Sequence, residues 1–119
     1  MNFDGKKFLK VGYHLENYSK EEEYQRSAIG RYYYASFLIA RNFYERSLNK
    51  KLPRFEAHKK LINYFKFSKI EDKKEIGKKL EILRTSRNDA DYINIDINEE
   101  DVENSRITSE EIISSIENL

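Results

Sequence analysis

One segment in the first half of the chain, residues 28–40, limits the possible folds more than any other. Its residues are apolar, aromatic or small, apart from the single charge of Arg31. A helix that is apolar on all sides is usually buried at the centre of a protein rather than placed at its surface. Because the helical pattern continues on both sides of this segment, we predict one long central helix over residues 20–48.

Shorter amphipathic patterns flank the central helix. Apolar residues at helical spacing predict four further helices, over residues 4–16, 55–67, 70–92 and 99–119. Ser19 is the expected N-cap of the central helix and Asn98 that of the last, while a capping-box pattern predicts an interruption near Ile107. Residues 93–97 alternate like a strand but have no partner, so we expect an extended connector. The links are short, which predicts an all-α bundle of four to five mostly antiparallel helices.

Length and charge narrow the range of functions. At 119 residues the chain is expected to form a single domain over residues 1–119. Its 22 basic and 21 acidic residues leave a formal net charge of +1. The basic excess of a typical nucleic-acid-binding domain is therefore missing, and any contact with RNA or DNA would depend on a local patch.

The sequence carries no signal for a metal, a cofactor or a membrane. Cysteine is absent, which excludes disulfides and thiolate metal sites. We find no P-loop, dinucleotide-binding fingerprint, His-Glu-x-x-His motif or Ser–His–Asp pattern. The first ten residues lack the apolar stretch of a signal peptide, and no run approaches the ~18–20 apolar residues of a transmembrane helix. We therefore expect a cytoplasmic protein that uses no metal and no cofactor.

The sharpest local anomaly is an arginine on the buried side of a predicted helix. Arg87 continues the helical spacing of Leu80 and Leu83, and Asp91 lies one turn further on the same face. An unpaired charge at a buried position is costly, so Arg87 must be paired or must face a cleft or a partner. Two interpretations are open: an intramolecular ion pair with Asp91, or a phosphate or RNA site or polar dimer seam, for which a guanidinium is well suited.

Other polar residues extend this patch along the same helix. Arg84, Asn88 and Tyr92 lie within about two helical turns of one another. The candidate site therefore consists of Arg87, Asn88, Asp91 and Tyr92, with Arg84 as a further RNA- or nucleotide-binding residue.

Three more basic residues are candidates for contacting RNA or a nucleotide. Arg31 has two open placements: it pairs with an acid such as Asp91, or it joins the cleft at Arg87. Lys50 and Lys51 follow the central helix in a basic link that could attract a phosphate backbone. The plainer alternative for these two lysines is an ordinary solvated surface.

Two strings give the chain a family resemblance. Residues 26–37, RSAIGRYYYASF, are similar to the R-A-I-x-R-A-Y-Y-A-x-F helix of HEPN (higher eukaryotes and prokaryotes nucleotide-binding) proteins. Residues 83–92, LRTSRNDADY, resemble the L-R-x-x-R-N-x-A-D-Y segment of the same family. The order and separation of the strings also fit, and the resemblance covers nearly the whole chain. The sequence thus resembles a small stand-alone prokaryotic HEPN protein.

The resemblance implies a homodimer in which two copies of an R-x4-6-H motif meet in a cleft. In active members this motif forms a metal-independent endoribonuclease. Arg87 takes the place of the motif arginine and Asn88 that of the polar residue after it, but Tyr92 stands where a histidine is expected. A tyrosine is a poor proton shuttle near neutral pH. Both histidines lie outside the motif, and for His58, at the start of the third predicted helix, a surface or capping role is expected.

The family also implies a biological setting. We expect an RNA-directed protein of toxin–antitoxin or antiphage-defence type, with a degenerate endoribonuclease motif and a nucleotidyltransferase antitoxin as partner. The alternative is a catalytically inactive HEPN module used for dimerisation and for binding a nucleotide or a protein partner. The missing motif histidine favours this alternative.

Overall fold

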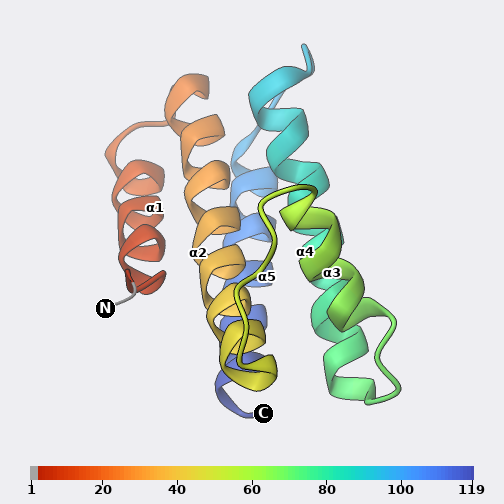
Figure 1. Cartoon of the computed structure of the whole chain (residues 1–119). Coiled ribbons are helices and arrows are strands. Elements are labelled where there is room, and N and C mark those ends of the chain that lie inside the picture. The colour runs from red at the N-terminus through yellow and green to blue at the C-terminus, as the bar shows by residue number, and fades with distance from the viewer. Residues whose placement is uncertain (1–2) are drawn as a thin grey trace.

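Five helices make up the computed structural model, which describes residues 3–119. They are α1 (Lys6–Tyr18), α2 (Glu22–Leu48), α3 (Ala57–Lys66), α4 (Glu71–Tyr92) and α5 (Glu99–Glu117). No strand occurs among the described residues. Successive helices run antiparallel except α2 and α3, which run in the same direction because the link between them returns along α2 (Figure 1). The predicted all-α bundle is confirmed.

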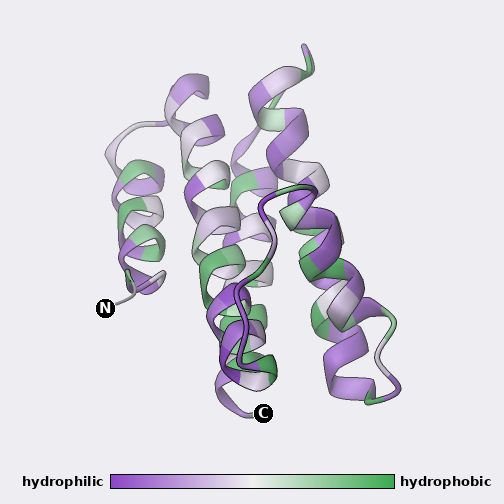
Figure 2. Ribbon diagram, in the orientation of Figure 1, coloured by the Kyte–Doolittle hydropathy of each residue, from purple (hydrophilic) through white to green (hydrophobic). Residues whose placement is uncertain are grey.

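The long helix α2 lies at the centre of the bundle. It contacts α1, α4 and α5 along its length and α3 over a shorter stretch. The residues of α2 at positions 28–40 are buried on several sides, as expected for a helix with neighbours all round. Figure 2 shows that every helix carries both hydrophobic and hydrophilic residues, so each has a face to bury and a face to expose.

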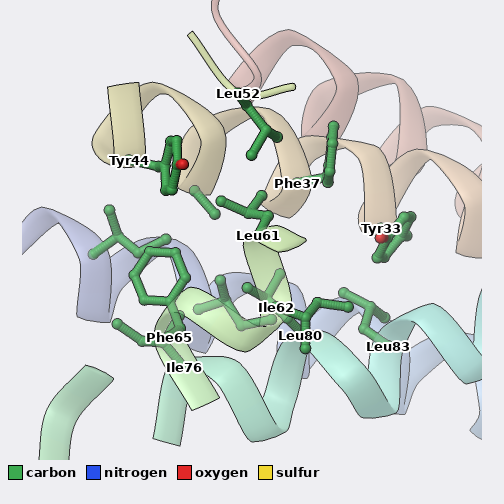
Figure 3. Close-up of a cluster of buried hydrophobic side chains, with 13 residues drawn as sticks. Tyr33, Phe37, Tyr44, Leu52, Leu61, Ile62, Phe65, Ile76, Leu80 and Leu83 are labelled. Atoms are coloured by element: carbon green, nitrogen blue, oxygen red, sulfur yellow. The ribbon is translucent and has the colours of Figure 1, made fainter. Parts of the chain in front are cut away.

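The larger part of the core lies between α2, α3, α4 and α5. Figure 3 shows Leu61 and Phe65 of α3 lying between side chains of α2 and side chains of α4. A second, smaller cluster is centred on Tyr32 and Val102 and packs against α1. The core therefore places α3 directly against α4 and near the middle of α2, where the candidate site lies.

Two details of the helix ends differ from the prediction. The helix α2 begins after Glu21, and the Ser19 hydroxyl accepts a hydrogen bond from the Glu21 N–H at 3.0 Å instead of capping the helix. The predicted interruption near Ile107 is wrong, because α5 is continuous there. Ser109 lies between Thr108 and Glu111, which have capping-box spacing; its hydroxyl is buried and donates to the Tyr32 carbonyl of α2 at 2.8 Å.

Other local predictions are confirmed. Asn98 forms a capping box with Asp101, each side chain accepting from the other residue's backbone N–H at 3.0 Å. Residues 93–97 form a non-helical connector between α4 and α5. Across residues 3–119, no helix has the length and apolar character needed to cross a bilayer.

Candidate functional site

Arg87 is held on the side of α4 that faces α2. Its side chain is only 15% exposed, and Nε lies 3.0 Å from an Asp91 carboxylate oxygen. The Nε–H is not directed at that oxygen, so the contact is an ion pair rather than a hydrogen bond. Nη1 donates to the Asn88 side-chain oxygen at 3.1 Å, and Nη2 donates to the Tyr34 hydroxyl at 2.8 Å. The ion pair with Asp91, one of the two interpretations of the sequence spacing, is therefore present, and Arg87 has two further partners.

Aromatic rings complete the surroundings of Arg87. The guanidinium carbon lies 5.1 Å from the ring centre of Tyr34, 5.9 Å from Tyr33 and 5.7 Å from Tyr92. These distances are within the range of cation–π attraction. The ring of Tyr92 is 73% exposed, so one edge of the guanidinium's surroundings is open to solvent. An exposed ring beside a cation is a surface on which a nucleobase can stack.

His58 belongs to this site, although a role at the surface or in a helix cap was expected from its position in the sequence. It is half-buried; its ring stacks on Phe37 with centroids 4.3 Å apart, and its Nδ1 is 2.6 Å from the Tyr33 hydroxyl. The N-cap of α3 is Glu56, so His58 does not cap the helix. The missed signal is the helical spacing from His58 to Leu61, which puts both residues on the buried face of α3.

The surroundings of His58 keep its imidazole uncharged near neutral pH. Burial lowers the pKa of His58, and the guanidinium groups of Arg84 and Arg87 lower it further. Burial also raises the pKa of Tyr33, so its hydroxyl keeps its proton beside the imidazole. A neutral imidazole close to two guanidinium groups can exchange a proton while the cations hold negative charge.

Unlike Arg87, Arg84 has no hydrogen-bond or ion-pair partner among residues 3–119. Its Nε is buried without a hydrogen-bond partner, and no carboxylate of residues 3–119 lies within 4.0 Å of its guanidinium. The structure thus gathers seven residues from α2, α3 and α4, which we call the Arg87 cluster. Its members are Tyr34, His58, Arg84, Arg87, Asn88, Asp91 and Tyr92.

The remaining predicted residues lie elsewhere. Arg31 is exposed, and its guanidinium carbon lies 5.2 Å from the ring of Phe8 in α1, so neither of its predicted placements is realised. Lys50 and Lys51 are exposed after the end of α2, and Lys51 is 3.9 Å from Glu45. At 1.5 Å per residue, the end of α2 is roughly 20 Å from Tyr34. None of the three contributes to the Arg87 cluster.

The pH dependence of stability should report on His58. The folded-state pKa of His58 is lower than the ordinary value of 6.5. As the pH falls through 6.5, the unfolded chain therefore binds more protons than the folded chain does. Stability is therefore expected to fall between about pH 7.5 and 5.5, and to stop falling, as far as His58 contributes, below its folded-state pKa.

Urea unfolding at the two pH values measures this contribution. His58→Gln should show a smaller loss than the wild type, whereas His14→Gln, at an exposed position of α1, should keep the wild-type loss. An unchanged loss in His58→Gln would contradict the assignment of this pH dependence to His58.

The fold and the site define a class of protein: a small α-helical bundle with an arginine cluster on the helix that precedes its last connector. The HEPN domain model matches residues 13–119, so the chain belongs to the HEPN family, as its two strings suggested. An uncharacterized protein of Methanocaldococcus jannaschii is 36% identical over 86 residues, covering 61% of this chain and 52% of that protein. The chain spans about half the length of this curated relative. No solved structure matches the chain.

Proposed function

We propose that the chain is an RNA-directed HEPN protein of toxin–antitoxin or antiphage-defence type, acting as a homodimer through the Arg87 cluster. The observation that supports this most is the meeting of two guanidinium groups, an imidazole and an exposed aromatic ring at the junction of α2, α3 and α4. HEPN domains commonly dimerise. A nucleotidyltransferase antitoxin is the proposed partner.

The chemistry of the cluster suits cleavage of RNA without a metal. A ribose 2′-oxygen would attack the adjacent phosphorus, and the 5′-oxygen would leave and take up a proton from water, giving a cyclic phosphate and a free 5′-hydroxyl. Arg87 would stabilise the charge on this phosphate, as guanidinium groups do in phosphoryl transfer. His58, the one imidazole in the cluster, would accept the 2′-hydroxyl proton in place of the histidine that Tyr92 replaces.

A second function has its own support. All three nitrogen positions of the Arg87 guanidinium contact groups of the same chain, and Tyr92 replaces the motif histidine. A catalytically inactive module that binds RNA, a nucleotide or a protein partner would not need a free guanidinium or the motif histidine. Binding without cleavage would then be the expected behaviour.

An RNA cleavage and binding assay separates these functions. Purified protein is mixed with end-labelled single-stranded RNA in the presence of a chelator, beside Arg87→Ala, Arg87→Lys and the control Lys50→Ala. We expect Arg87→Ala to lose at least about tenfold in cleavage rate, because a group that stabilises developing charge contributes about 10²–10³. Arg87→Lys keeps the charge but loses the planar fork, so it should be intermediate.

The outcomes are distinct. Cleavage that Arg87→Ala abolishes and Lys50→Ala preserves supports the enzyme. Binding without cleavage by the wild type supports the inactive module. A wild-type protein that neither binds nor cleaves RNA would show that the proposed function is wrong.

A further inference from the structure

An open cleft lies between α3 and α4, directly beside the Arg87 cluster. Its volume is about 180 Å³, and the buried side chain of Ile62 contributes to its wall. The polar residues that line it are Lys59, Asn63, Glu81, Arg84, Thr85 and Asn88. Cavities that enclose a whole small-molecule ligand are typically about 300–1,000 Å³, so this cleft is suited to a single chemical group.

The charges in the cleft leave it positive. Among residues 3–119, no carboxylate lies within 4.0 Å of Lys59 or of Arg84. The one acid of the cleft, Glu81, is already neutralised by Lys66 at 2.9 Å. The pKa of His58, which Arg84 and Arg87 both lower, responds to the same local excess of positive charge.

The contact between Arg87 and Asn88 leaves a hydrogen-bond donor of Asn88 available to the cleft. Arginine only donates, so the Asn88 atom that contacts Arg87 at 3.1 Å must be the oxygen. This fixes the orientation of the amide and leaves the Asn88 NH₂ group as a donor on a residue that lines the cleft. Lys59 and Arg84 add charged donors, and charge-assisted hydrogen bonds to phosphate are among the strongest in proteins.

We propose that this cleft is a phosphate subsite for single-stranded RNA, in which Lys59, Arg84 and Asn88 hold the phosphate next to the nucleotide at Arg87. The inference rests on the proposed function and adds to it a second contact on the RNA strand. A single strand suits the geometry, because its unstacked bases can reach the exposed ring of Tyr92 while its backbone follows the cationic groups.

The salt dependence of RNA binding tests the subsite. The affinity for a fluorescein-labelled oligouridylate is measured at several salt concentrations for wild type, Lys59→Ala and Lys60→Ala. The two variants lose the same charge at adjacent exposed positions, but Lys60 lies over the Phe55 ring at 5.5 Å and does not line the cleft. Loss of one phosphate contact should reduce the slope of log affinity against log salt by about 0.7 in Lys59→Ala only.

Each result has one meaning. A reduced slope in Lys59→Ala with a wild-type slope in Lys60→Ala supports the subsite. If wild type binds RNA and the two variants have equal slopes, the subsite is wrong while the proposed function stands. If wild type binds no RNA, both are wrong. Because Lys59 is exposed and has no carboxylate partner among residues 3–119, its replacement should leave the circular dichroism spectrum unchanged.

Discussion

Replacing Gly77 with alanine is expected to destabilise the fold by roughly 2 kcal/mol, the net of two opposing effects. Gly77 is buried in α4 and lies against Lys66, the last residue of α3. A Cβ atom on Gly77 would lie 2.3 Å from the backbone nitrogen of Lys66 and 2.5 Å from its Cα. Backbone atoms cannot swing aside as the end of a side chain can, so α3 must move away from α4. We expect this to cost on the order of 3 kcal/mol, of which the better helix propensity of alanine returns about 1 kcal/mol.

Gly30 in α2 provides a matched control. A Cβ atom at this position meets nothing within 4 Å, so Gly30→Ala should stabilise the helix by about 1 kcal/mol. Urea unfolding followed by circular dichroism measures both variants. A Gly77→Ala protein that is as stable as Gly30→Ala would show that α3 and α4 do not approach so closely. Since α3 carries His58 and Lys59, its displacement should also weaken RNA binding by the Gly77→Ala protein.

Periodicity predicted the helices well because each helix is defined by its own local pattern. The ends of α2 at Leu48 and α4 at Tyr92 agree with the prediction, since a basic link and an alternating segment follow them. The prediction went wrong where one string can serve two purposes. A string with capping-box spacing, such as residues 108–111, can begin a helix or can lie inside one. The Ser109 contact that holds this string inside α5 comes from the packing of α5 on α2.

In the candidate site, too, contacts within one helix could be foreseen from the sequence, whereas contacts between helices could not. Arg87 and Asp91 lie on one helix, so their spacing alone indicated the ion pair as one of two interpretations. Tyr34 binds Arg87 from α2 and His58 packs on Tyr34 from α3, and no local pattern states how α3 packs against α2. Arg31 shows the converse: its sequence neighbours are buried, but its own direction on α2 is toward Phe8 of α1.

Arg26→Ala is expected to release the segment that follows α4, at a cost of roughly 3 kcal/mol. The side chain of Arg26 reaches from α2 across to the end of α4 and the connector. The carbonyl groups that accept hydrogen bonds from it are those of Asp89, Ala90, Ile93 and Ile95. Its Nη2 also donates to Glu22 at 3.1 Å, and Glu22 in turn accepts from the Ile97 N–H at 2.9 Å. One guanidinium thus serves as a partner of the Ala90 carbonyl at the end of α4 and of two carbonyls of the connector.

Two variants separate this role from a general effect of charge. Arg31→Ala, five residues further along α2, loses only an exposed contact with Phe8 and should cost at most about 1 kcal/mol. Arg26→Lys keeps the charge without the planar fork and should fall between the two. Hydrogen exchange locates the loss: in Arg26→Ala the amide of Ile97 should exchange much faster, and an unchanged rate would mean that Arg26 does not hold the connector.

Asp91 and Tyr92 lie between the carbonyls that Arg26 binds, so loosening this segment should also free Arg87 from Asp91. Arg26 would then support the candidate site without touching RNA, which predicts weaker RNA binding in Arg26→Ala but not in Arg31→Ala.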